Sequence, residues 1–192
     1  MGLNSSIKLT DEDIVRLVQS GNIEIFGEIV NRYEEKIKRY GRKFLSGTED
    51  IEDIVQDTFI KAYENIQEFD AKRRFSSWLY RIAHNEFINA LKKQKKKPLS
   101  IFELDTILPY HFEKEMQQEM DRGEIIKALD KCLDNLDLKY REPIILYYLE
   151  GLDYKEIADV LRIPISTVGI RLKRGKNKIK FIYNKLIHKT YE

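Results

Sequence analysis

The chain has 192 residues, 34 of them Lys or Arg and 32 Asp or Glu, so its formal net charge is only +2. Glycine (9) and proline (4) are scarce and apolar residues recur with helical spacing, which predicts an all-α protein with room for one or two small domains. The single cysteine, Cys132, excludes an internal disulfide framework. No segment has the length of a membrane span and no secretory apolar stretch is present, so we expect a cytoplasmic protein.

The first half of the chain is predicted to form four amphipathic helices. A short helix opens at a capping box from Thr10 to Asp13, where an N-cap acceptor meets a carboxylate three residues later. Apolar residues at steps of three and four then predict three longer helices. These helices span about residues 23–45, 51–66 and 76–95. Because the four helices can share one core and Pro98 ends the pattern, we expect a first domain over residues 1–97.

A change of pattern separates this domain from the rest of the chain. Residues 98–122 mix apolar and acidic residues irregularly and include Pro109, which is typical of a linker. Helical periodicity resumes at about Gly123. The sequence therefore predicts two small helical domains joined by a flexible linker, the second over residues 123–192.

The second domain carries the local pattern of a helix-turn-helix. Asp153 and Glu156 form another capping box at the start of a short helix, and Pro164 breaks that helix. Ser166 is then placed to cap a second helix, expected over residues 167–181. Two short helices joined by a tight turn are the arrangement that places a recognition helix in a major groove.

Charge is segregated along the chain in four bands, one of which, residues 99–121, has six acids against one base. Residues 162–191 contain nine Lys or Arg and no acid, a one-sided charge that indicates an anionic partner such as DNA. Residues 48–70 contain eight acids against one base, with Asp53, Gln56 and Asp57 on one polar helix face. This face could dock a basic partner or could simply be solvated.

The remaining band, residues 71–97, has nine bases against one acid and interleaves them with aromatic residues such as Trp78. Single-stranded nucleic acid binds to such mixtures, because bases stack on rings while phosphates contact cations. The alternative is that most of these aromatic residues belong to the core.

Three motifs occur in an order that resembles a known family. They are D-I-V-Q-D-T-F-I-K-A-Y (53–63), F-S-S-W-L-Y-R-I-A-H-N (75–85), and Y-K-E-I-A-D-V-L-R-I-P-I-S-T-V (154–168) followed by L-K-R-G-K (172–176). Together they resemble the sigma factors of bacterial RNA polymerase, specifically the compact extracytoplasmic-function (ECF) group, over about residues 10–182.

The resemblance implies a promoter-specificity subunit that binds core RNA polymerase, reads two promoter elements and helps to melt the DNA, so that its partners are duplex promoter DNA and the melted non-template strand. Residues that match the polymerase-binding helix are Asp53, Gln56, Asp57 and Phe59. Residues expected on the minus-ten element and the melted non-template strand are Lys72, Arg73, Arg74, Trp78, Arg81, Asn85, Lys92 and Lys93. Residues expected on the upstream, minus-thirty-five element are Ser166, Thr167, Arg171, Lys173, Arg174, Lys176 and Lys178. An anti-sigma factor, often a membrane protein in this group, is a further implied partner.

One departure from the group affects the recognition helix. Members commonly carry a cation and then a serine where this chain has Gly169 and Ile170. Because glycine inside a helix costs about 1 kcal/mol relative to alanine, we expect a looser helix start and one contact fewer. The group's upstream sequence preference therefore cannot be transferred to this chain.

Other classes of function fit the sequence less well. His84, His111 and His188 are scattered, without metal-ligand spacing or a glycine-rich phosphate loop, so we expect no catalytic residue, metal or cofactor. A stand-alone helix-turn-helix regulator is the main alternative, and an adaptor that sequesters other factors is a third. A regulator would need a dimerisation module with a large apolar outer face, which the charged first half does not offer.

Overall fold

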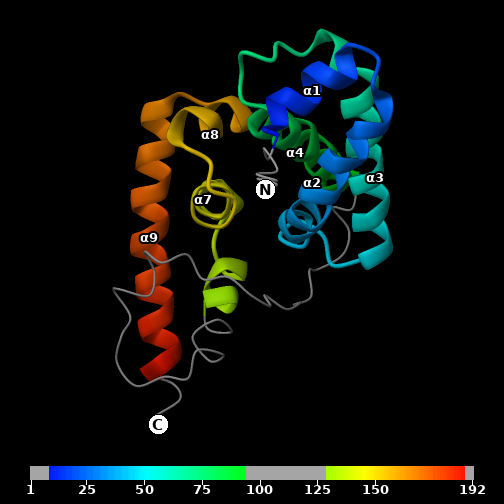
Figure 1. The fold of residues 1–192 in the computed structure, drawn as a ribbon. Coiled ribbons are helices and arrows are strands. Elements are labelled where there is room, and N and C mark those ends of the chain that lie inside the picture. The colour runs from blue at the N-terminus through cyan, green and yellow to red at the C-terminus, as the bar shows by residue number, and fades with distance from the viewer. Residues whose placement is uncertain (1–8, 94–128, 189–192) are drawn as a thin grey trace, which may run out of the picture.

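The computed structural model describes residues 9–93 and 129–188, and every regular element within these ranges is helical (Figure 1). The first domain contains α1 (Asp11–Gln19), the 3-10 turn η1 (Ile23–Ile25), α2 (Phe26–Gly41), α3 (Thr48–Glu64), the 3-10 turn η2 (Ile66–Glu68) and α4 (Phe75–Lys93). The second contains α7 (Leu138–Ile144), the π-helical turn η3 (Ile145–Leu149), α8 (Tyr154–Leu161) and α9 (Ile165–His188). The all-α prediction is confirmed, whereas the predicted linker lies outside the described residues.

The long helix expected over residues 23–45 is shorter and divided. It starts as the turn η1 and ends at Gly41, although Lys43, Phe44 and Leu45 after it are also buried. Gly41 is required by packing, since a Cβ built there would lie 2.4 Å from Cζ of Phe87 on α4. The helix therefore ends where α4 crosses it closely.

The first domain is built around one aromatic-rich core, as its periodicity predicted. Helices α1 to α4 each contribute fully buried side chains, among them Ile14, Ile29, Ile37, Tyr40, Phe44, Phe75, Leu79, Tyr80 and Phe87. The rings of Phe44 and Phe87 stack at a centroid distance of 5.7 Å, and Tyr40 meets Phe87 edge to face at 5.9 Å. This packing fixes the angle of α4, which carries the predicted strand-binding residues.

The second domain packs α7, α8 and α9 around a smaller aliphatic core. Gly175 of α9 faces α7, and a Cβ added to it would lie 2.5 Å from Cδ1 of Ile144. Pro143 lies inside α7, and the wide turn η3 follows it directly, because a proline removes one helical hydrogen bond. Cys132 is fully buried and acts as a small apolar core residue, and burial raises the pKa of its thiol to about 11.

The helix-turn-helix is present with one difference at its turn. Both predicted capping boxes form, at Thr10 and at Asp153. The prediction that Ser166 caps the second helix was wrong, because α9 begins at Ile165. The carbonyl of Pro164 accepts the first hydrogen bonds, at 2.9 and 3.2 Å, so Ser166 lies within the first turn.

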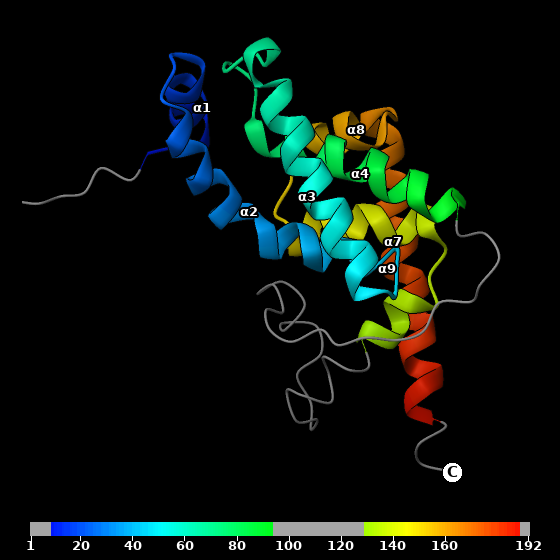
Figure 2. The same ribbon diagram turned by 90° about the vertical axis from the view of Figure 1, so that its right-hand side faces the viewer.

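The two domains pack against each other, which the sequence did not predict. Helix α8 lies along α4 in both views of the molecule (Figures 1 and 2). The first-half surface that was expected to bind DNA therefore faces the second domain.

Candidate nucleic-acid interface

The loop that precedes α4, residues 70–74, is held in place by α1. The side-chain amide of Gln19 donates to the carbonyls of Ile66 and Phe69, at 2.7 and 2.8 Å. The Arg16 guanidinium donates to the carbonyl of Ala71 at 3.1 Å. Because three carbonyls on the approach to the loop are fixed in this way, its cations project from a defined backbone.

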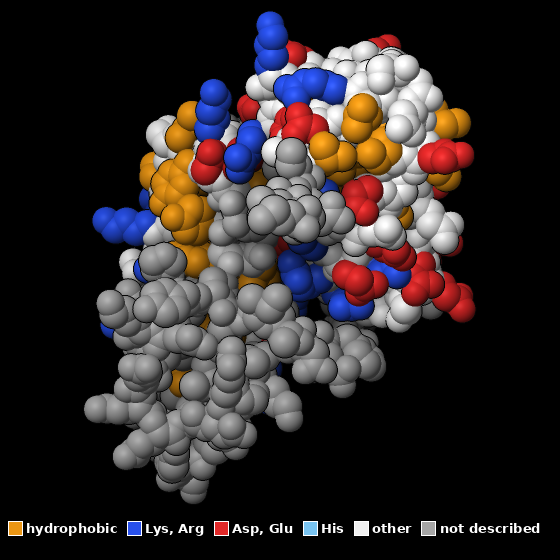
Figure 3. All heavy atoms as spheres, viewed as in Figure 1, with side chains coloured by type: hydrophobic (Ala, Val, Ile, Leu, Met, Phe, Trp, Pro, Cys, Tyr) orange, Lys and Arg blue, Asp and Glu red, His pale blue; other side chains and the backbone are white. Residues whose placement is uncertain are grey.

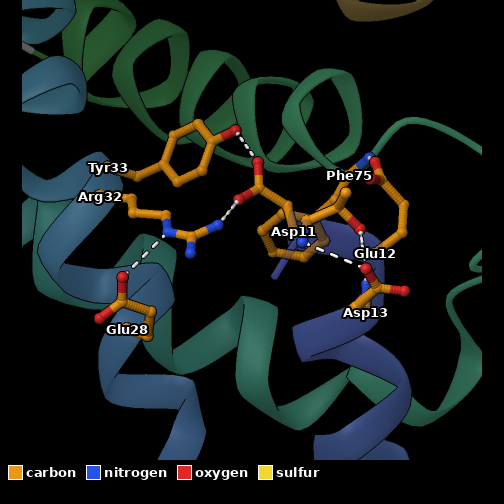
Figure 4. Close-up of polar contacts among 8 residues, drawn as sticks. Asp11, Glu12, Asp13, Glu28, Arg32, Tyr33 and Phe75 are labelled. Atoms are coloured by element: carbon orange, nitrogen blue, oxygen red, sulfur yellow. Dashed lines mark hydrogen bonds and ion pairs between the residues drawn. The ribbon is translucent and has the colours of Figure 1, made fainter. Parts of the chain in front are cut away.

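The other end of the loop is fixed by Glu12, whose carboxylate accepts a hydrogen bond from the Phe75 backbone N–H at 2.9 Å (Figure 4). This N–H begins α4, where a negative group also opposes the positive end of the helix dipole. Asp11 anchors α1 itself, accepting from the hydroxyl of Tyr33 at 2.5 Å and pairing with Arg32 at 2.7 Å. Sequence reasoning assigned no role to α1, since these contacts are not local.

The predicted minus-ten residues share one surface, named here the melting surface and formed by loop 70–74 and the outward side of α4. Trp78, Arg81, Asn85 and Lys92 follow one another at steps of three, four and seven, so they share that side of the helix. The Trp78 ring is partly buried and packs on Phe69 at a centroid distance of 4.9 Å. Trp78 therefore belongs partly to the core, as the alternative interpretation of the aromatic residues held.

Asn85 sits in the middle of this surface. It is partly exposed, and within the described part of the chain its side-chain amide has no hydrogen-bond partner. An amide held by internal partners would indicate a structural role, so this arrangement suits an external ligand.

The loop cations of the melting surface are paired with acids of α8. Arg73 meets Asp159 at 3.0 Å and Arg74 meets Glu156 at 3.0 Å. The hydrogen bond that Arg74 donates to Glu156 raises the pKa of Arg74. A narrow cavity remains between the helices, lined by Arg73, Arg74, Ser77, Trp78, Arg81 and Asp159. The second domain thus places carboxylates against the cations that were expected to hold DNA phosphates.

Deeper in the interface, Glu150 is clamped by two residues of the first domain. The Arg39 guanidinium donates to both of its carboxylate oxygens at 2.9 Å, and the Tyr80 hydroxyl donates to one of them. The Glu150 side chain has no exposed area, and burial raises the pKa of its carboxyl although Arg39 opposes this. Glu150 directly follows η3, so the wide turn after Pro143 helps to direct this carboxylate towards α2.

Two further buried contacts cross the interface. Lys43, only 4% exposed, pairs with Asp130. Glu142, 6% exposed, accepts from the Tyr40 hydroxyl at 2.6 Å and contacts Nδ1 of His84. Burial raises the pKa of Tyr40 well above its ordinary value, with the Glu142 charge adding to the effect. Charged groups this deeply buried are costly unless paired, so the interface depends on complementary partners.

The predicted minus-thirty-five residues lie on α9, where they divide into two groups. Ser166, Lys173 and Arg174 are exposed opposite the buried face, as is the apolar Ile170, which the prediction omitted. The other predicted residues lie nearer to the buried face of α9. Thr167 and Arg171 are partly buried, whereas Lys176 is exposed. Lys178 is exposed too, and it pairs with Asp137 at 3.6 Å. Apolar side chains cover much of the surface where α8 and α9 lie, with Lys and Arg beside them (Figure 3).

The predicted polymerase-binding residues lie on α3. Asp53, Gln56 and Asp57 are exposed, as expected. Acidic side chains gather on the side of the molecule where α3 lies (Figures 1 and 3). Phe59 is a correction to the predicted set, because it is 7% exposed and belongs to the core. It supports α3 from within, since the apolar stripe of the helix faces inward.

Sequence reasoning missed the two acids of α8 that pair with cations of the melting surface. The sequence pattern assigned Glu156 only to the capping box of α8. The capping contact forms, because the Asp153 N–H donates to one Glu156 carboxylate oxygen at 2.8 Å. The other carboxylate oxygen of Glu156 contacts the guanidinium of Arg74. No local pattern distinguishes an acid with one partner from an acid with two.

No helix among the described residues is long and apolar enough to cross a membrane. No group of three or more His, Cys, Asp and Glu side chains within residues 9–93 and 129–188 is arranged to hold a metal ion.

Comparison with known proteins agrees with this architecture. Residues 29–97 match the family described as Sigma-70 region 2, and residues 126–179 match Sigma-70, region 4. The chain is 32% identical to the ECF RNA polymerase sigma factor SigW of Bacillus subtilis, over 86% of this chain and 92% of the relative. It is 34% identical to the ECF RNA polymerase sigma-E factor of Escherichia coli K12, over 91% and 94%.

Two solved structures have similar folds over most of their length. CnrH in complex with the cytosolic domain of CnrY has a TM-score of 0.69 and 25% identity, over 91% of this chain and 97% of that one. The sigma factor RpoE in complex with the anti-sigma factor NepR from Bartonella quintana has a TM-score of 0.62 and 24% identity, over 83% and 96%. With its two matching regions and its full-length relatives, the chain belongs to the ECF sigma factors of bacterial RNA polymerase, which direct promoter-specific initiation of transcription.

Proposed function

We propose that three surfaces divide the work of this sigma factor between its domains. In the first domain, residues 1–97, the exposed acids of α3 bind core polymerase and the melting surface holds the opened minus-ten strand. In the second, residues 123–192, the outward face of α9 reads the minus-thirty-five duplex. The factor acts in the cytoplasm as a non-catalytic subunit, and an anti-sigma factor is expected to bind it, as NepR binds RpoE of Bartonella quintana.

The contacts of Arg73 and Arg74 carry a second part of the proposal. Their partners Asp159 and Glu156 occupy the positions that DNA phosphates would take on the same guanidinium groups. A strand and these two carboxylates cannot use the same donors at once. In the packed arrangement of the two domains, the two carboxylates therefore compete with a DNA strand for these two cations, whose side chains are 55% and 69% exposed.

Promoter geometry also requires the domains to separate. Elements named for positions ten and thirty-five are about 25 base pairs apart, or roughly 85 Å of duplex at about 3.4 Å per base pair. A compact chain of 192 residues has a radius of gyration of roughly 16 Å. The two domains cannot contact both elements while α8 lies against α4. We propose that binding to core polymerase separates them.

The test compares two DNA probes with the free factor and with the factor bound to core polymerase. One probe is a duplex carrying the upstream element of a promoter selected from a random pool, and the other is the single non-template strand of its minus-ten element. We expect the free factor to bind the duplex measurably and the single strand weakly. The complex with core polymerase should bind both, measured by fluorescence anisotropy at fixed salt.

Equal binding of the single strand by the free factor and by the complex would contradict competition between the α8 carboxylates and the strand for Arg73 and Arg74. Failure of either form to prefer the selected duplex over a scrambled duplex would contradict the role of α9. The two parts of the proposal can therefore fail separately.

The role of Asn85 in opening the DNA is tested by transcription from two promoter templates. Asn85→Ala should reduce transcription from a fully duplex promoter more than from one with a pre-melted bubble, because its amide would stabilise a base that has left the stack. Gln67→Ala, which removes an exposed amide of η2 outside the melting surface, is the control and should change neither. No loss with Asn85→Ala on either template would exclude it from the melting surface.

A further inference from the structure

An exposed isoleucine lies in the middle of the DNA-facing side of α9. Val168, Leu172 and Ile179 of this helix are buried, and Ile170 is two residues from Val168, about 200° around the helix axis. Its side chain is 51% exposed. The residues one turn away on the same side, Ser166 and Arg174, are exposed and polar. Ile170 therefore has no part in the core, and packing within the fold does not explain it.

The backbone beside Ile170 is unusually bare. Gly169 has no side chain, and a Cβ built there would meet only the edge of the Tyr154 ring, at 3.5 Å. The position could therefore hold a larger side chain, so steric packing does not require the glycine. A glycine at this place allows a groove wall to approach the helix closely. Ile170 then projects next to a gap instead of next to a cation.

Base-pair edges in a major groove offer one apolar group, the 5-methyl of thymine. An isoleucine can neither donate nor accept a hydrogen bond, so the only base feature that it can select by favourable contact is this methyl. Recognition helices contact bases with their N-terminal residues, and Ile170 lies in the second turn of α9. We propose that Ile170 determines specificity in the upstream element by contacting the methyl group of one thymine.

This inference rests on the proposed role of α9, and the experiment separates the two. The probe is the upstream duplex of a promoter selected by the factor with core polymerase, and each thymine is replaced in turn by deoxyuridine, which lacks only the methyl. We expect one replacement to weaken binding by the complex about fourfold, the effect of exposing one methyl group. Ile170→Ala should bind the unmodified duplex correspondingly less well and should no longer distinguish thymine from deoxyuridine.

Two sets of variants provide the controls. Phe181→Ala removes another exposed apolar side chain of α9, 71% exposed and about 16 Å further along the helix, and should keep the full response to deoxyuridine. Lys173→Ala and Arg174→Ala should weaken binding to all the duplexes. If those two variants have no effect, the role of α9 fails. If they weaken binding but no deoxyuridine replacement does so, only the role of Ile170 fails.

Three other results would overturn the proposal. They are a selected element without any A·T pair, a deoxyuridine effect that persists in Ile170→Ala, and a loss of core-polymerase binding by Ile170→Ala with unchanged duplex binding. The last result would assign this exposed apolar residue to a protein contact. Ile170 is exposed, so its replacement should leave the fold intact, which circular dichroism of the same sample checks.

Discussion

The two proposed DNA-binding surfaces of this sigma factor differ in whether acidic side chains of the other domain pair with their cations. On the melting surface, Arg73 and Arg74 are paired with carboxylates of the other domain. On α9, Lys173 and Arg174 are exposed and, within the described residues, have no acidic partner. All four side chains are exposed, so the difference within the described part of the chain is that the cations of the first domain are paired with carboxylates and those of α9 are not.

This difference indicates how one chain can separate two binding events. In the proposed function, the exposed α9 is available for duplex DNA at once, whereas Arg73 and Arg74 of the melting surface first have to lose their carboxylate partners. The contact between Arg73 and Asp159 is weak, since both side chains are about half exposed and such pairs contribute at most about 1 kcal/mol. The buried pairs deeper in the interface must therefore control the docking of the domains.

The largest effect is expected from Lys43→Ala. It leaves Asp130 buried without its cation, and breaking a buried ion pair in this way costs about 3–5 kcal/mol. The variant should separate the domains and increase binding of the single minus-ten strand by the free factor, while duplex binding stays the same. Docking is measured by energy transfer between dyes on cysteines introduced at the exposed Arg42 and Lys139.

The control for this prediction replaces both partners. Lys43→Met with Asp130→Leu should dock again, because apolar residues of similar volume can replace a buried ion pair without loss of stability. Cys132 should remain unlabelled, since it is buried and its thiol has a pKa of about 11. Unchanged energy transfer in Lys43→Ala would show that other contacts hold the domains together.

A second pair of variants tests the α9 side alone. Gly175→Ala should destabilise the second domain by about 1–3 kcal/mol, because its Cβ would lie 2.5 Å from Cδ1 of Ile144. Gly169→Ala meets only Tyr154 at 3.5 Å, so it should be tolerated and should stabilise the helix by up to about 1 kcal/mol. Thermal unfolding distinguishes them, and equal shifts in the same direction would contradict the packing of α9 on α7.

The third prediction concerns α3, which neither DNA surface includes. Asp57→Lys should weaken binding to core polymerase about tenfold, which corresponds to about 1.4 kcal/mol, with little change in stability because the residue is exposed. Glu64→Lys, an exposed acid at the end of the same helix, is the matched control. Identical affinities of both variants in a pull-down with core polymerase would remove Asp57 from the contact.

The smallest effect is a pH dependence of docking. Burial raises the pKa of Glu150, so the docked state binds a proton more readily than the separated state, in which the carboxyl is solvated. Stability that depends on a raised pKa is present at low pH and is lost as pH rises through it, so this contribution should strengthen docking below neutrality. Energy transfer measured against pH should show this trend, and Glu150→Gln should flatten it. A trend of the opposite sign in the unsubstituted chain would contradict the assignment to Glu150.

The sequence by itself determined the local features of this protein. Apolar spacing placed the helices, and the capping boxes at Thr10 and Asp153 formed as predicted, because each involves residues only three positions apart. The order of the three motifs indicated the family. Errors at this level were small, as at Ser166, where the carbonyl of Pro164 begins α9 instead.

Only the tertiary structure decided which charged residues face each other. Arg74 and Glu156 are 82 positions apart, and Arg39 and Glu150 are 111 apart, with the linker between them. The charge pattern shows how many cations a segment has, but it carries no information on which distant carboxylate lies against them. Only the structure showed that Phe59 is a core residue and not a polymerase contact. Helical periodicity does not distinguish an apolar residue that faces a partner from one that faces the core. Whether a basic segment is free to bind DNA depends on the docking of two domains, and that is a property of the packed chain.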